Sequence, residues 1–198
     1  MVVRDGSRSY RFGAACVLLA VVVFSVLYLI AASQDPDYEF LENYLSDLGV
    51  GPAGWAFNSA LMLSGALILI FAYAGLRPLL GVIFVSKAGS TMLAAAGVFL
   101  VNVGIFTEDY GDIHLAFSLA FFLTLLAALG FLAYALHVTK ALGLTGTAAS
   151  VSAFVLGLLL LVMGIGPLAE TLAVLTALGW GSVVGVLMLL KAGGMNIP

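Results

Sequence analysis

Residues 35–49 read DPDYEFLENYLSDLG and hold five of the ten acidic residues of a chain that is otherwise almost wholly apolar. Asp35 suits a helix N-cap, Pro36 suits the first helical position, and Gly49 suits the position just past a helix end. Between these signals, apolar and acidic residues recur at helical spacing on opposite faces. The apolar face carries Tyr38, Leu41, Tyr44, Leu45 and Leu48. The stretch therefore predicts a short amphipathic helix at about 36–48 that lies in a membrane interface.

The composition of the whole chain places this helix in an integral membrane protein. Of its 198 residues, 63% are hydrophobic and only 9% are charged, whereas a soluble domain carries about 25% charged residues. We expect one membrane domain over residues 1–198. There is no basic patch, which argues against a nucleic-acid partner. The one cysteine, Cys16, excludes an internal disulfide.

Six apolar runs predict six transmembrane helices, because each is close to the about 20 residues that a helix needs to cross a bilayer. The predicted spans are 12–32, 55–75, 88–106, 113–136, 148–165 and 168–190. Arg77 and Pro78 are expected to end the second span, and a short connector to lead to Lys87. The predicted fold class is therefore an all-α, polytopic membrane helical bundle with six transmembrane helices and the interfacial helix.

The charged residues sort by side in this arrangement. With six spans, all seven Lys and Arg residues fall on the side of the two termini, and nine of the ten acidic residues fall on the other. Basic loops stay in the cytoplasm. The sequence thus predicts a multi-pass protein of the cell membrane with both termini cytoplasmic and the acidic stretch outside.

The few polar residues inside the spans lie near the predicted outer ends. Asn58 and Asn102 lie about one turn from the ends of their helices, and His114 opens the fourth span with Ser118 one turn deeper on the same face. Polar groups at membrane depth usually face the bundle interior, which predicts an outward-facing polar pocket. The candidate substrate-binding residues are Glu42, Asn43, Asn58, Asn102 and Ser118.

Two kinds of chemistry fit such a pocket. In the first, Asp47, His114 and Ser46 act as catalytic groups. In the second, oxygen ligands and one imidazole hold a divalent cation, a set that suits calcium or a catalytic zinc better than a structural zinc. The candidate metal ligands are Asp47, Glu108, Asp109 and His114. Ser118 with His114 as base is a further option.

Each of these residues also has a structural interpretation. The asparagines can bond neighbouring helices, and loop carboxylates are commonly solvated. His114 can bond a loop carboxylate at its helix N-terminus, and a membrane serine such as Ser118 can bond the carbonyl four residues back.

Geometry weakens two functional classes. His114 and His137 are 23 residues apart, about 34 Å along one helix, so they cannot hold a haem within one chain. A coupled transporter usually keeps an ionisable group at mid-membrane, and none of the predicted spans has one there.

Three motifs resemble the domain-of-unknown-function 998 family of six-helix membrane proteins. They are ENYLSDLG at 42–49, Phe57-Asn58, and GVFLVNVGIFTEDYGDIH at 97–114, which has Thr107 where the family usually has proline. The resemblance covers roughly residues 12–190 and implies six helices, with no activity assigned. The motif positions that it marks are Ser46, Asp47, Asn58, Glu108, Asp109 and His114.

The ENYLS segment is more faintly similar to alkaline ceramidase and progestin-receptor-like membrane hydrolases. Those enzymes use an H-x-x-x-H pair, and this chain has only two histidines, on opposite sides of the membrane. Two functions therefore stay open. One is a lipid-directed protein, either a metal-dependent hydrolase or a lipid-binding protein. The other is a non-enzymatic accessory subunit that meets other membrane subunits or a second copy of itself; a small-molecule transporter ranks third.

Overall fold

The computed structural model describes residues 3–164 and 166–195, which form six long helices and several short helical turns without a strand in those ranges. All six long helices are long and apolar enough to cross a membrane, the second together with the turns that continue it to Leu80. They are α1 (Val3–Gln34), α2 (Gly54–Ile70), α4 (Phe84–Ile105), α5 (Asp112–Thr139), α6 (Gly143–Met163) and α7 (Pro167–Ala192). The all-α, six-helix membrane bundle predicted from the sequence is confirmed. The predicted end of the fifth span, Ile165, lies outside the described residues.

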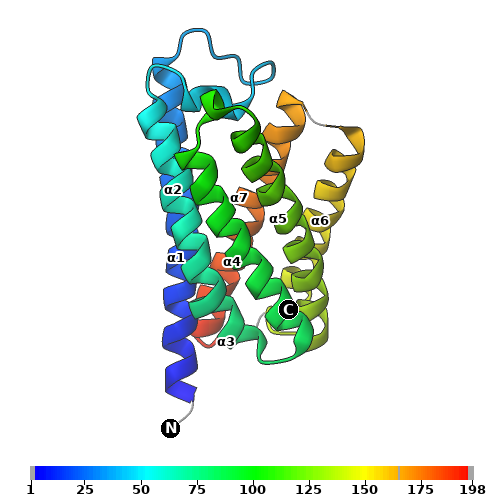
Figure 1. Cartoon of the computed structure of the whole chain (residues 1–198). Coiled ribbons are helices and arrows are strands. Elements are labelled where there is room, and N and C mark those ends of the chain that lie inside the picture. Colours follow the sequence, from blue (N-terminus) through cyan, green and yellow to red (C-terminus); the bar gives the residue numbers. More distant parts are fainter. Residues whose placement is uncertain (1–2, 165, 196–198) are drawn as a thin grey trace.

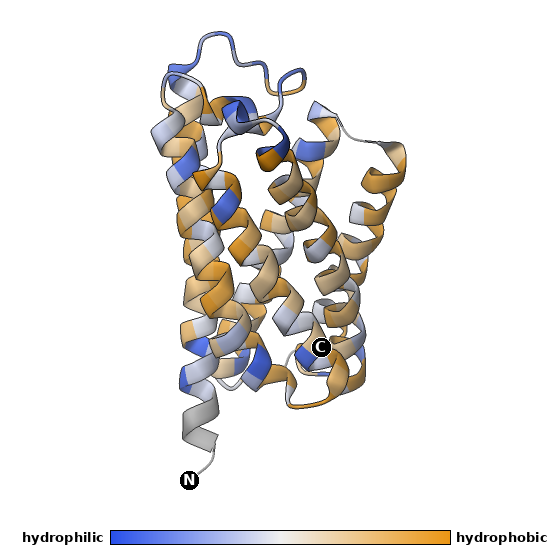
Figure 2. Cartoon of the chain, in the orientation of Figure 1, coloured by the Kyte–Doolittle hydropathy of each residue, from blue (hydrophilic) through white to orange (hydrophobic). Residues whose placement is uncertain are grey.

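The helices form a closed ring in chain order, with α7 returning to pack against α1 (Figure 1). Each successive helix runs opposite to the one before it. The loops therefore gather at two ends, and Figure 2 shows hydrophilic residues concentrated there with apolar helices between. We call the end with residues 35–53, residues 106–111 and the start of α7 the acidic end. The opposite end, with loops 81–83 and 140–142, is the basic end.

Glycines let the helices of the α1–α2–α4 side approach closely. A Cβ built on Gly97 of α4 would lie 2.6 Å from the carbonyl oxygen of Gly65 on α2, and Gly13 and Gly75 touch between α1 and the continuation of α2. Helices in lipid gain little from the hydrophobic effect, so they associate through such backbone contact.

The amphipathic helix predicted at 36–48 does not form. Residues 35–44 are turns, and only η1, a 3-10 helix at Leu45–Gly49, follows them. The Asp35 carboxylate accepts a hydrogen bond from the N–H of Asp37 (3.2 Å), and the Asn43 side-chain oxygen accepts one from the N–H of Glu39 (2.8 Å). Side chains that bond nearby backbone N–H groups in this way compete with helix formation.

The second helix also continues through Arg77 and Pro78, which were predicted to end it. α2 passes into η2, a π-helical segment at Phe71–Leu76, and then into α3 (Arg77–Leu80). The N–H of Arg77 bonds the carbonyl of Ala72, five residues back. Pro78 fits directly after this wide turn because the first turn of a helix needs no N–H from it. The helix ends instead at Gly81, whose φ is +75°.

The close approach of α2 and α4 gives a stability prediction. Gly97→Ala should destabilise the protein by about 1–3 kcal/mol, because the added methyl group meets backbone that cannot rotate away. Gly179→Ala on α7 is the matched control, since a Cβ there meets nothing within 4 Å. Thermal unfolding in detergent measures both. Equal melting temperatures for the two variants would show that the helices do not pack this closely.

Candidate functional site

The main cavity has a volume of about 480 Å³ and runs from the acidic end into the bundle between α5, α6 and α7. Its lining on α5 extends from Asp112 to Leu129, about 25 Å along a helix. The polar lining residues lie mostly at the acidic end, and leucine and alanine side chains line the rest. Such a long volume with one polar end has the dimensions of a small-molecule site, which typically measures about 300–1,000 Å³.

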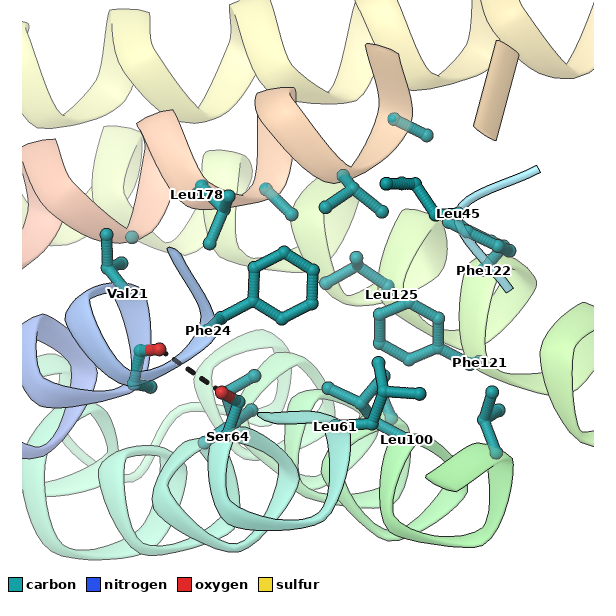
Figure 3. A pocket seen from close by; sticks show the side chains of 18 of the residues that line it. Val21, Phe24, Leu45, Leu61, Ser64, Leu100, Phe121, Phe122, Leu125 and Leu178 are labelled. Atoms are coloured by element: carbon teal, nitrogen blue, oxygen red, sulfur yellow. Dashed lines mark hydrogen bonds between the residues drawn. The ribbon is translucent and has the colours of Figure 1, made fainter. Parts of the chain in front are cut away.

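A smaller cavity of about 100 Å³ lies at the centre of the ring. Figure 3 shows apolar side chains of several helices around it, among them Phe24 of α1, Leu100 of α4 and Phe121 of α5. The two cavities share one wall, which includes Ser46, Ser118, Phe122, Leu125 and Glu170. This wall carries two of the predicted site residues, Ser46 and Ser118.

His114 and Ser118 are hydrogen-bonded on the cavity surface. The Nδ1 atom of His114 lies 2.7 Å from the carbonyl oxygen of Phe106, and its Nε2 atom lies 3.3 Å from Oγ of Ser118. A carbonyl oxygen only accepts, so Nδ1 carries the proton and donates it. In the neutral ring, Nε2 then accepts from the Ser118 hydroxyl. The ring of Phe106 stacks on Phe117 with centroids 5.2 Å apart, which fixes the carbonyl that orients the imidazole.

Three carboxyl groups organise the mouth of the cavity. Glu170, in the first turn of α7, accepts a hydrogen bond from the N–H of Leu45 (2.8 Å), and Asp47 accepts one from the N–H of Tyr44 (3.0 Å). The first bond holds η1 over the bundle, and the second caps η1 itself. Glu108 lines the cavity from η3 (Glu108–Tyr110).

Burial raises the pKa of Glu108 to about 7, and a hydrogen bond with the Asp47 carboxyl and the negative charges of Asp47 and Glu170 act in the same direction. A carboxyl that holds its proton can donate to a neighbouring carboxylate. Loops η1 and η3, which touch at this point, are therefore joined by a contact that depends on that proton.

The other predicted substrate-binding residues do not line either cavity. Asn58 donates to the carbonyl of Gly49 (2.8 Å) and so fixes the end of η1, while Asn102 donates to Val98 on its own helix (2.8 Å). Glu42 is exposed, and the side-chain oxygen of Asn43 accepts a hydrogen bond from the N–H of Glu39 within the same turn. The three asparagines thus bond the backbone, and none of the four residues lines the two cavities.

Of the predicted metal ligands, Asp47 and Glu108 meet at the mouth of the cavity, while Asp109 and His114 have other partners. Asp109 is exposed and accepts a hydrogen bond from Thr107, Asp47 bonds the backbone, and both nitrogens of His114 are engaged. Among residues 3–164 and 166–195, no three His, Cys, Asp or Glu side chains form a group that could hold a metal ion.

The sequence prediction assigned no catalytic, binding or metal role to Glu170 or to the apolar walls. Glu170 carries a visible signal, since it is a lone carboxylate in the first turn of an otherwise apolar span. The walls carry none, because a leucine that faces a cavity and one that faces lipid look alike in sequence.

The sequence of this chain matches the family described as Protein of unknown function (DUF998) over residues 18–188. The chain belongs to that family. The match begins within α1 and ends within α7, so it includes the whole or part of each of the six membrane helices of this DUF998 protein. Neither curated proteins nor solved structures gave a match, so the fainter similarity to membrane hydrolases is not supported.

The raised pKa of Glu108 predicts how stability depends on pH. A pKa of about 7 in the folded protein lies above the ordinary value of 4.5, so the folded state binds the proton more tightly. This contribution is complete below pH 4.5 and is lost as the pH rises through 7. The melting temperature should therefore fall between pH 5 and 8 less steeply in Glu108→Gln than in the unmodified protein. Glu42→Gln, an exposed carboxyl near the same mouth, is the control, and an unchanged slope in Glu108→Gln would contradict the assignment.

Proposed function

We propose that this DUF998 protein binds a membrane amphiphile, with the polar headgroup at the acidic end and the apolar chain in the cavity between α5, α6 and α7. The observation that carries this proposal is that the cavity lining is polar at one end and apolar at the other. Glu108, His114 and Glu170 contribute polar atoms at one end, while residues such as Leu126 and Leu129 line the deeper region. This order matches the order of polar and apolar regions in a lipid.

The charge of the mouth favours one kind of headgroup. Two carboxyl groups, Glu108 and Glu170, line the cavity there, and Asp47 lies against Glu108. Carboxylates attract amines and accept hydrogen bonds from hydroxyl groups, whereas they repel phosphate. The headgroup that fits is thus an amine or a polyol rather than an anion.

We place the acidic end on the outer face of the cell membrane and both termini in the cytoplasm. The support is the charge distribution: Arg8, Arg11, Arg77, Lys87, Lys140 and Lys191 belong to the basic end of the bundle. The positive-inside rule puts that end in the cytoplasm. The amphiphile would accordingly come from the outer leaflet.

Cysteine labelling tests this orientation. In a Cys16→Ser background, a cysteine introduced as Glu39→Cys in the exposed acidic loop should react with a membrane-impermeant maleimide in intact cells. Met195→Cys, an exposed position after α7, should react only after permeabilisation. The reverse pattern would place the mouth of the cavity on the cytoplasmic side.

Filling the cavity tests the binding itself. Ala173 of α7 lines both cavities, so Ala173→Trp should occupy the volume of the apolar chain and lower lipid occupancy about tenfold, equivalent to about 1.4 kcal/mol. Leu175→Trp on the same helix is the matched control, because Leu175 is exposed and lines neither cavity. Native mass spectrometry of protein purified in mild detergent measures the bound lipid.

The same preparation decides between this function and an accessory subunit. That second candidate is favoured by Phe40 and Leu41, which are 44% and 60% exposed on the acidic loop and offer apolar contact beside carboxylates. Lipid retained by the control and lost in Ala173→Trp supports amphiphile binding. Protein that holds no lipid and purifies with a stoichiometric membrane partner supports the accessory subunit.

A further inference from the structure

We propose that Ser118 and His114 form a nucleophile–base pair that cleaves an acyl ester of the bound amphiphile. This inference rests on the proposed amphiphile binding and adds a reaction to it. It needs no metal, since an oriented serine–histidine pair performs acyl transfer by itself.

The direction of the Ser118 hydrogen bond separates it from other helix serines and threonines of this protein. Ser90, Ser150 and Ser182 each bond a carbonyl of their own helix four residues back, at 2.8–3.0 Å. That pattern is the ordinary one for a serine in a membrane helix. The hydroxyl of Ser118 instead meets a ring nitrogen, Nε2 of His114, at 3.3 Å.

The imidazole is oriented for the role of a base. Its Nδ1–H is held by the Phe106 carbonyl at 2.7 Å, which leaves the Nε2 lone pair toward Ser118. His114 is 9% exposed, so little water competes for that nitrogen. A nucleophile, a base and a third group that orients the base are the arrangement by which an activated hydroxyl is recognised.

The position of Ser118 selects the substrate class. Glu108, Gly111 and His114 line the cavity toward its mouth, and Leu119, Phe122 and Leu126 begin the apolar lining deeper in the bundle. In an acyl lipid the carboxylic ester joins the headgroup to the chain at the same border between polar and apolar regions. An ester whose acyl chain fills the cavity would therefore place its carbonyl carbon beside Oγ.

The reaction proceeds in two balanced steps. Oγ of Ser118 attacks the carbonyl carbon and passes its proton to Nε2 of His114; the C–O bond to the headgroup then breaks, and the departing alkoxide takes that proton. Water next attacks the acyl-serine and gives a proton to Nε2, the Oγ–C bond breaks, and Oγ recovers the proton. The products are the free headgroup alcohol and a fatty acid.

The test uses the full-length protein in detergent with two probes, an alkyl fluorophosphonate and a long-chain p-nitrophenyl ester. We expect the fluorophosphonate to form a covalent bond to Ser118, identified by peptide mass spectrometry. Ser118→Ala and His114→Gln should each lower ester cleavage by at least about 100-fold, the range of positioned acid–base groups. Ser182→Ala is the matched control, because its hydroxyl bonds the carbonyl of Leu178 on its own helix, and it should cleave at the unmodified rate.

Melting temperatures and lipid retention are measured on the same samples. Variants that keep both and lose cleavage support the reaction, since a folding defect would remove all three. Absence of the fluorophosphonate adduct on Ser118, or cleavage that persists in Ser118→Ala, overturns it. A retained lipid without the adduct overturns the ester cleavage alone and leaves amphiphile binding in place.

Discussion

The structure depends on one constraint: a hydrogen-bonding group in the hydrocarbon of a bilayer finds no water and must be satisfied within the protein. Several helix serines and threonines meet it by bonding their own helix, as Ser90, Thr147 and Ser150 do. Trp180 meets it by donating to Ser150 across the α6–α7 contact at 2.9 Å. The polar groups that reach beyond their own helix at the acidic end are therefore informative. Asn58 of α2 bonds the carbonyl of Gly49 in η1, and His114 of α5 bonds the carbonyl of Phe106 in the preceding loop.

The two halves of the ring use different packing. Between α1, α2 and α4, glycines bring backbones into contact, as at Gly65 and Gly97. Between α5, α6 and α7, larger apolar side chains leave the long cavity. Because lipid tails are as apolar as leucine, an apolar cavity beside lipid costs little when a lipid chain fills it. The closely packed helices α1, α2 and α4 thus support helices α5, α6 and α7, which leave room for a ligand.

The acidic end joins these halves through carboxyl groups as well as through the buried side chains of Leu45 and Leu48. Glu170 of α7 holds the backbone of Leu45, and Glu108 meets Asp47. Burial raises the pKa of Glu108 to about 7, and the hydrogen bond with Asp47 and the charges of Asp47 and Glu170 act in the same direction, so this carboxyl can keep its proton beside Asp47. The contact between η1 and η3 at the mouth of the cavity consequently depends on whether Glu108 keeps its proton.

The sequence by itself determined the class of protein and the number of membrane helices, because hydropathy and charge asymmetry are local properties that survive any packing. It also marked Ser46, Glu108, His114 and Ser118 as polar residues near one end of the spans, and these four line the cavity between α5, α6 and α7. It predicted wrongly a helix at 36–48, since side chains of Asp35 and Asn43 cap the backbone locally, and a helix end at Pro78, since a π-helical segment precedes it.

Only the tertiary structure decided which polar residues share a cavity. Asn58 and Asn102 have the same depth signal as His114, yet their amides bond backbone carbonyls. The pairing of Glu170 with Leu45 joins residues 125 positions apart, and the choice of Nε2 as the acceptor for Ser118 follows from a carbonyl eight residues away. Such contacts depend on how the helices rotate and pack against one another. The local pattern of residues along the sequence does not reveal that arrangement.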